Sequence, residues 1–149
     1  MQRTYEAMAT RVMAGGDRQR RMQAVVDLLW DGLKDTGVAW VGFYLLEGGQ
    51  ELVLGPRRDK PACSPIGLHG VCGQAATQRR ARVVADVKDL GANYVACDPR
   101  DRSEVVVPLF EPDGTCWGVL DLDSHDVRSF DEDDVNGLQL VLRAAGLTT

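Results

Sequence analysis

Three of the chain's four cysteines lie in or beside connections without regular periodicity, where a thiol can take part in chemistry. Cys97 belongs to the polar connection 93–104, Cys63 lies in the connection 55–68, and Cys72 follows shortly after it. Long connections without periodicity are typically functional or disordered, and the charged residues around Cys97 favour a function. We therefore predict that Cys97 is a redox nucleophile and that the other elements build a pocket in front of it.

Metal binding is the competing use for such thiols. Cysteines in a reducing compartment are more often buried, metal-binding or catalytic than structural bridges. Cys63, His69, Cys72 and Cys97 could supply four zinc ligands, but their spacing matches no familiar Cys/His pair pattern. Each thiol alone could be a buried residue without a role. Three of them together favour thiol–disulfide exchange, and we expect no bound metal.

A group of carboxylates is expected close to these thiols. Asp121 and Asp123 are two residues apart on a strand and so project from the same face. Folding the hairpin about the turn near Asp113 brings Glu104 opposite them. Three carboxylates on one face repel, so at least one should have a raised pKa, as suits a proton donor or the binding of an ammonium group. The alternative is an ordinary solvated face with unrelated acids.

Two aromatic residues share one face of the strand predicted at 38–46. Trp40 and Tyr44 lie on that face with Gly42 between them, and they serve either for packing or for contact with a ligand. The glycine-bordered segment 70–76 predicts a helix start, whose free amide groups favour an anion or carboxylate nearby.

Local sequence signals mark the ends of the remaining helices and strands. Asp17 and Gly37 delimit a predicted amphipathic helix, and Ser129 with Glu132 predicts a capping box for the last helix. Cys116 is expected in the core, on the sheet face opposite the acids. The order of helices and strands predicts an α+β fold around a mainly antiparallel sheet.

Length and charge limit the class of protein. With 149 residues, 1–149 is most simply one domain. The net charge of −5 argues against nucleic acid or an anionic membrane surface as partner. No apolar run approaches the roughly 20 residues needed to span a bilayer, and the first residues lack a signal-peptide pattern. We expect a cytoplasmic protein.

Short segments from about residue 38 to the C-terminus form a further pattern: 40–46, 52–56, 60–63, 70–73, 96–98, 103–104, 108–109, 118–124 and 130–133. They resemble the GAF-domain enzymes that reduce free methionine-(R)-sulfoxide, and three cysteines in the same order make the resemblance specific. It implies a GAF fold with a six-stranded sheet, the terminal helices on one face and the ligand pocket on the other. It also implies a homodimer and recycling by thioredoxin, with no cofactor.

The resemblance assigns roles to individual residues. It implies that Cys97 attacks the sulfoxide sulfur and that Cys63 is the usual resolving thiol. The segment between Cys63 and Cys72 is one residue shorter than in the family, which leaves Cys72 open as an alternative resolving thiol. The implied substrate-binding residues are Trp40, Tyr44, Glu104, Asp121 and Asp123.

Two other classes of function are compatible with the same fold. A non-catalytic GAF module could sense a small molecule in the pocket, because a fold alone does not define a function. A zinc-stabilised interaction domain is the other. The three loop cysteines favour the enzyme, since a sensor has no need of them.

Overall fold

The computed structural model describes residues 2–12, 15–93 and 97–149. Residues 94–96, part of the connection in which we predicted the nucleophile, lie outside the described residues; Cys97 lies within them.

The centre of the fold is a five-stranded antiparallel sheet with the strand order β2-β1-β5-β4-β3. The strands are β1 Val38–Glu47, β2 Glu51–Arg58, β3 Arg82–Val84, β4 Ser103–Phe110 and β5 Cys116–Ser124. The expected α+β architecture around an antiparallel sheet is confirmed, with one strand fewer than expected. Beside β2, the segment before α3 forms only an isolated bridge between Leu52 and Ile66. At the next hydrogen-bonding position, the Leu54 N–H bonds to the Ser64 side chain and not to its carbonyl, so the bridge does not extend into a ladder.

In the described residues, four α-helices accompany the sheet: α1 Tyr5–Thr10, α2 Arg18–Leu33, α3 Val71–Gln78 and α4 Glu132–Ala144. Two 3₁₀ segments, η1 Lys34–Thr36 and η2 Val87–Asn93, complete the fold. Within the described residues, no helix combines the length and the apolar character needed to cross a membrane.

The ends of the helices follow local sequence signals, and one predicted cap is wrong. The Asp17 side chain accepts a hydrogen bond from the Arg20 N–H, and Gly37 ends η1 with a φ of +100°. The predicted capping box was placed too early. Asp131, not Ser129, caps α4, and Asp134 completes the box. Ser129 instead accepts a hydrogen bond from Arg3 through its side chain.

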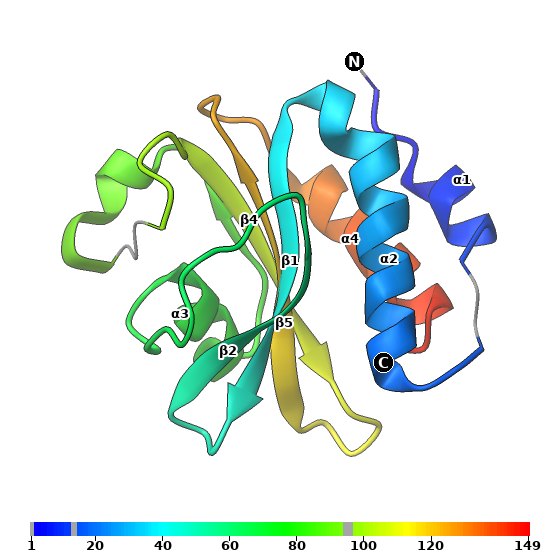
Figure 1. Ribbon diagram of the computed structural model, residues 1–149. Coiled ribbons are helices and arrows are strands. Elements are labelled where there is room, and N and C mark those ends of the chain that lie inside the picture. The colour runs from blue at the N-terminus through cyan, green and yellow to red at the C-terminus, as the bar shows by residue number, and fades with distance from the viewer. Residues whose placement is uncertain (1, 13–14, 94–96) are drawn as a thin grey trace.

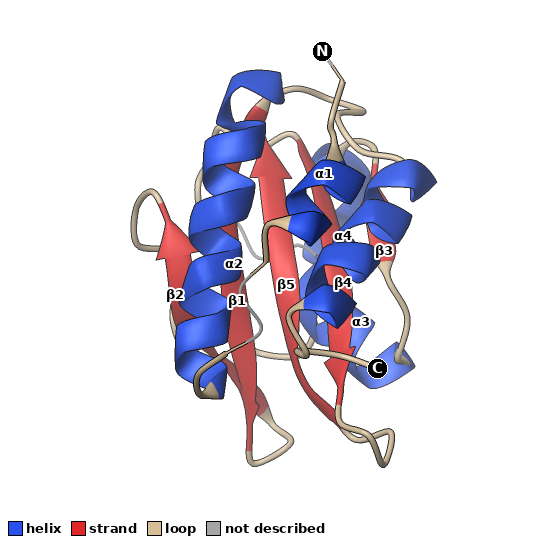
Figure 2. Ribbon diagram, turned by 90° about the vertical axis from the view of Figure 1, so that its right-hand side faces the viewer, coloured by secondary structure: helices blue, strands red, loops and turns tan. Residues whose placement is uncertain are grey.

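The sheet separates two layers. Helices α1, α2 and α4 cover one face, whereas α3 and the long connections cover the other, as Figures 1 and 2 show from two directions. Each layer has its own apolar cluster. Alternation along β1 sends Val41 and Phe43 to the helical layer, and Trp40 and Tyr44 to the layer of α3. The predicted division of β1 into a core face and an aromatic face is confirmed.

A bulge in β5 overturns the prediction for Cys116. Leu109 pairs with Gly118, but Phe110 pairs with Cys116, so the register shifts by one residue at this end of the hairpin. The shift turns Trp117 towards the helical layer and Cys116 towards the α3 layer, on the same side as the acids. Cys116 is only partly buried there and is a free thiol.

Candidate active site

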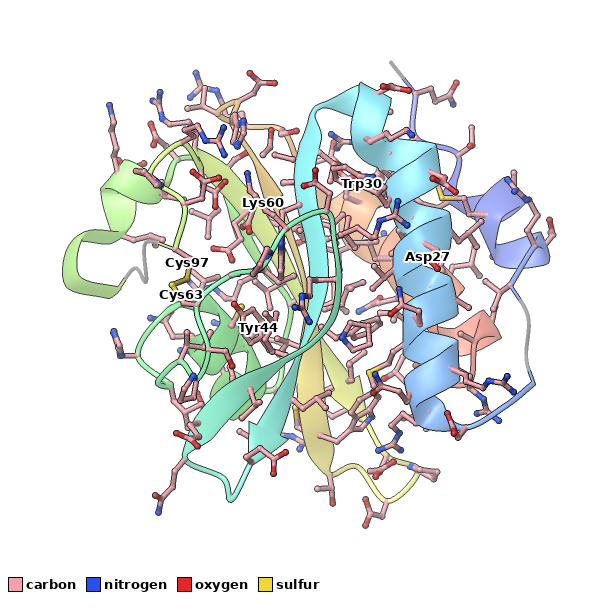
Figure 3. All side chains as sticks on the ribbon, viewed as in Figure 1. Asp27, Trp30, Tyr44, Lys60, Cys63 and Cys97 are labelled. Atoms are coloured by element: carbon pink, nitrogen blue, oxygen red, sulfur yellow. A yellow bond between two sulfur atoms is a disulfide. The ribbon has the colours of Figure 1, made fainter. Side chains whose placement is uncertain are left out.

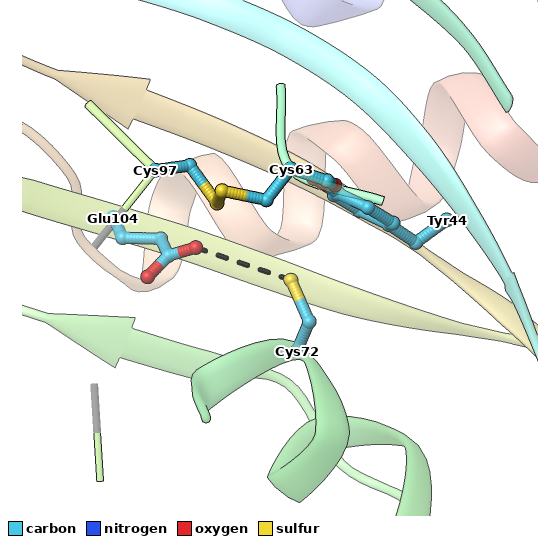
Figure 4. Close-up of a disulfide and its surroundings, with 5 residues drawn as sticks. All are labelled: Tyr44, Cys63, Cys72, Cys97 and Glu104. Carbon is cyan, nitrogen blue, oxygen red and sulfur yellow. Dashed lines mark hydrogen bonds between the residues drawn. A yellow bond between two sulfur atoms is a disulfide. The ribbon is translucent and has the colours of Figure 1, made fainter. Parts of the chain in front are cut away.

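Cys63 and Cys97 meet although 34 residues separate them in the chain. Their sulfur atoms are joined as a disulfide, and the Cα atoms are 5.5 Å apart. Such a Cα separation lies in the middle of the range that a disulfide requires. Figure 3 shows the pair on the side of the sheet opposite α2, and Figure 4 shows it above Glu104 and Cys72. The two thiols are therefore within reach of one another for exchange chemistry.

The segment that carries Cys63 is held by Trp40 and Tyr44, the two aromatic residues on the pocket face of β1. The Trp40 indole donates a hydrogen bond to the Lys60 carbonyl, and the Tyr44 hydroxyl donates one to the Cys63 carbonyl, both at 2.8 Å. The two rings are tilted neighbours with centroids 6.1 Å apart. Trp40 and Tyr44 thus line the pocket and also position the backbone that carries one of its thiols.

Cys72 lies in the first turn of α3, under the disulfide. Its thiol is buried, and Sγ donates a weak hydrogen bond to Glu104 Oε2 at 4.0 Å (Figure 4). Burial raises the pKa of the Cys72 thiol well above its ordinary value, and the neighbouring Asp121 and Glu104 charges raise it further. A protonated, buried thiol is a poor nucleophile.

The three predicted carboxylates do meet on one sheet face. Glu104 on β4 pairs directly with Asp123 on β5, and Asp121 lies one step along the same face. Glu104 and Asp121 are buried, while Asp123 is partly exposed. Removal from water, reinforced by their mutual repulsion, raises the pKa of both Asp121 and Asp123 well above its ordinary value. Burial also raises the pKa of Glu104.

One carboxylate oxygen in this group has no partner within the described part of the chain. Asp121 Oδ1 is buried and accepts no hydrogen bond. Leaving such an acceptor unsatisfied is costly, and native proteins rarely do so without reason. A ligand that brings a donor into the pocket would satisfy it.

Asp101 is an acidic pocket residue that we did not predict. Its side chain lines the same cavity, and the residue is only 8% exposed. Burial, together with the charges of Asp98 and Glu104, raises the pKa of Asp101 to about 7. On the outer side, His125 Nε2 lies 3.7 Å from Asp101 Oδ1. No periodicity marks the connection 93–104, so only its charged composition hinted at such a residue.

The cavity unites the predicted groups between the sheet and α3. It is bounded by one cysteine of the disulfide, the buried Cys72 thiol, two aromatic rings, four acidic side chains and the first residues of α3. Its lining includes Trp40, Tyr44, Gly70, Val71, Cys72, Gly73, Cys97, Asp101, Glu104, Asp121 and Asp123. Cys63 does not line it and joins the site through its bond to Cys97.

The zinc arrangement considered from the sequence is not assembled. Within the described residues, two groups of possible ligands lie close enough to share an ion: Cys72 with Glu104 and Asp121, and Asp98 with Asp101 and His125. Neither contains Cys63, whose sulfur is bonded to Cys97.

Known proteins are similar to this chain in sequence and in fold. The GAF domain family matches residues 17–148. The free methionine-R-sulfoxide reductase of Saccharomyces cerevisiae is 38% identical over 117 residues, which are 75% of this chain and 64% of that protein. The chain therefore matches slightly less than two thirds of that relative's length.

Solved structures give a fuller match. The reduced form of fRMsr of Staphylococcus aureus has a TM-score of 0.81 and 36% identity, covering 95% of this chain and 92% of that one. The free methionine-R-sulfoxide reductase of Neisseria meningitidis, in complex with its substrate, also has a TM-score of 0.81, with 35% identity over 97% of this chain and 87% of that one. The fold is that of a GAF domain. Within that class, the chain belongs to the family of free methionine-R-sulfoxide reductases.

Proposed function

We propose that this protein is an oxidoreductase that reduces free L-methionine-(R)-sulfoxide to methionine. The observation that carries the proposal is one cavity in which Cys97, bonded to Cys63, faces a group of buried carboxylates. Membership of the reductase family supports the substrate class.

The lining suggests how the substrate is held. The ammonium group would pair with Glu104, Asp121 and Asp123, and would satisfy the unpartnered Asp121 oxygen. Trp40 would cover the S-methyl group. The first amide groups of α3 would receive the substrate carboxylate, because a helix N-terminus carries free N–H donors.

The chemistry needs a thiolate and a proton donor. The Cys97 thiolate attacks the sulfoxide sulfur while a carboxyl of raised pKa donates a proton to the oxygen. The transient bond between the Cys97 sulfur and the substrate sulfur breaks together with the sulfoxide S–O bond, the oxygen passes to Cys97 as a sulfenic acid, and methionine leaves. The substrate sulfur gains two electrons and the Cys97 sulfur loses two. Asp101, with its pKa raised to about 7, and the acids of the sheet are the candidate donors.

A second thiol then returns the enzyme towards its starting state. We assign this resolving role to Cys63, because its Cα atom lies 5.5 Å from that of Cys97. Cys72 would shape the pocket, since burial raises its pKa and its sulfur contacts Glu104. Thioredoxin would reduce the disulfide in the cytoplasm. We further propose that residues 1–149 act as one GAF domain, within a homodimer.

An NADPH-coupled assay with thioredoxin and thioredoxin reductase tests this function on the separated R and S diastereomers of free methionine sulfoxide. The expected result is NADPH oxidation with the R diastereomer of the free amino acid and none with the S diastereomer. Absence of turnover with the R diastereomer would overturn the proposal. Saturable binding without turnover would then indicate a sensing module.

A further inference from the structure

An ion pair links the two segments that carry the disulfide. Lys60 lies three residues before Cys63, and Asp98 directly follows Cys97. Lys60 Nζ and Asp98 Oδ2 are 3.1 Å apart. Figure 3 shows Lys60 on the same side of the sheet as both cysteines. In the part of the chain that the structure describes, this is the only hydrogen bond or ion pair between residues 59–65 and residues 97–102.

Both ends of this ion pair are anchored in their own segments. The Lys60 carbonyl accepts the hydrogen bond from the Trp40 indole at 2.8 Å. Asp98 Oδ1 accepts hydrogen bonds from the Arg100 backbone and side chain, each at 3.0 Å. His125 Nε2 lies 3.6 Å from Asp98 Oδ2. An attraction between two anchored groups is transmitted to the cysteines beside them.

Asp98 remains charged under ordinary conditions. Its hydrogen bonds with Arg100, and then with Lys60, hold the pKa of Asp98 well below its usual range. The Asp98 side chain is 17% exposed and that of Lys60 is 39% exposed. An ion pair of this exposure contributes little to overall stability. It can nevertheless hold two nearby segments in register.

We propose that the Lys60–Asp98 ion pair positions Cys63 against Cys97 for disulfide closure, and that it does so without taking part in sulfoxide reduction. The role deepens the proposed function and rests on it. Lys60 and Asp98 are positioning residues, because they act through the cysteines beside them.

The step they assist is the condensation of a sulfenic acid with a thiolate. The Cys63 thiolate attacks the Cys97 sulfur, an S–S bond forms, and the Cys97 S–O bond breaks. The departing hydroxide takes a proton from solvent and leaves as water. The Cys63 sulfur is oxidised and the Cys97 sulfur is reduced, so the step needs no further reactant.

The first test measures the disulfide without any sulfoxide. Protein is equilibrated in mixtures of reduced and oxidised dithiothreitol, and the Cys63–Cys97 bond is quantified by alkylation and mass spectrometry. Lys60→Met should lower the equilibrium constant for disulfide formation by about three- to fivefold, the scale of one exposed ion pair. Lys60→Arg keeps the charge and should therefore restore the wild-type equilibrium constant. Lys88→Met is the matched control, because Lys88 is exposed and its ammonium has no ion pair within the described residues.

A double-mutant cycle isolates the pair. Asp98→Asn keeps an oxygen for the Arg100 backbone N–H but removes the charge. If the ion pair carries the effect, Lys60→Met combined with Asp98→Asn should be no worse than either single variant. The wild-type constant should also fall with added salt, whereas that of Lys60→Met should change less.

The second test follows the rate of closure. Reduced protein is mixed with one equivalent of hydrogen peroxide, which oxidises a thiolate to sulfenic acid, and the disulfide is quantified over time. Lys60→Met should close about three- to fivefold more slowly and leave more sulfenic acid for trapping by dimedone. With methionine-(R)-sulfoxide as oxidant, the rate of the first methionine release should stay at the wild-type value.

The two proposals fail differently. Without methionine release from the wild type the proposed reductase function fails, while the dithiothreitol equilibrium still decides the role of the ion pair. Equal equilibrium constants and closure rates for Lys60→Met and wild type would overturn that role. An equal loss in Lys88→Met would also overturn it, because the effect would then follow from net charge.

Discussion

The indole ring of Trp40 occupies the space above Gly42. A β-carbon on Gly42 would overlap Cη2 and the adjacent carbons of the six-membered ring. Both residues lie on the β1 face that points into the pocket, beside Asp121 and Asp123 on β5. Gly42 is therefore what allows Trp40 to lie flat against the sheet and reach the Lys60 carbonyl.

Gly42→Ala should displace the Trp40 ring and raise KM for methionine-(R)-sulfoxide by roughly tenfold, the scale of one lost apolar contact. The measurement is steady-state kinetics together with tryptophan fluorescence. Gly55→Ala, in β2 of the same sheet, is the control, since its β-carbon would make only ordinary contacts with Phe43 and Leu45. Unchanged KM and fluorescence in Gly42→Ala would contradict the prediction.

Cys97→Ser should abolish turnover and leave the fold intact, because a partly buried loop thiol contributes little to the core. Circular dichroism and the coupled assay measure the two properties. Cys116→Ser, the other partly buried thiol, should change the stability modestly and the rate hardly at all. Retained multiple turnover in Cys97→Ser would move the nucleophile to Cys72.

Glu104→Gln and Asp123→Asn should each lose much of the activity without unfolding the protein. A charge-assisted hydrogen bond to the substrate ammonium is worth roughly 1.5–3 kcal/mol, which corresponds to about 10- to 150-fold in kcat/KM. Thermal unfolding serves as the control measurement. Wild-type kinetics in both variants would mean that the substrate binds elsewhere.

Asp101 should make stability depend on pH. Because its folded-state pKa is about 7, against an ordinary value of 3.8, the folded protein binds the extra proton between these values. The stability that this proton uptake contributes to the folded protein is therefore lost as the pH rises from the ordinary pKa of Asp101 through its folded-state pKa. Relative to wild type, Asp101→Asn should gain roughly 1–3 kcal/mol between pH 4 and pH 8 in urea unfolding. The exposed Asp31→Asn should show no such gain, and an equal gain there would contradict the assignment.

Protein treated with one equivalent of methionine-(R)-sulfoxide and no reductant should contain mainly the Cys63–Cys97 disulfide. The Cα separation of 5.5 Å permits it, whereas Cys72 is held in the first turn of α3. Peptide mapping under non-reducing conditions identifies the bond. A dominant Cys72–Cys97 bond would assign the resolving role to Cys72 and would fit the shorter segment between Cys63 and Cys72.

Sequence patterns within single strands and turns predicted most of the fold. Alternation along β1 and β5 predicted the faces of Trp40, Tyr44, Asp121 and Asp123, because successive side chains of a strand must point to opposite sides. The turn near Asp113 brought Glu104 opposite the segment 121–123, and the bulge near Cys116 then set its direct pairing with Asp123. These parts of the site follow from short-range geometry.

Other features depend on long-range contacts. The bulge at Cys116 shifts the register by one residue and reverses the face of that thiol, and no pattern in the sequence marks it. The capping residue of α4 also differs from the prediction: Asp131 and Asp134 form the capping box, whereas the Ser129 hydroxyl accepts a hydrogen bond from the distant Arg3.

The amino-acid sequence by itself determined the kinds of groups available: three thiols in order, paired carboxylates on a strand, and two aromatics separated by a glycine. Only the tertiary structure decided which groups of the long connections meet. It joined Cys63 to Cys97, brought Asp101 into the cavity and paired Lys60 with Asp98. Connections without periodicity take their path from the surfaces on which they pack, so local sequence cannot specify these contacts.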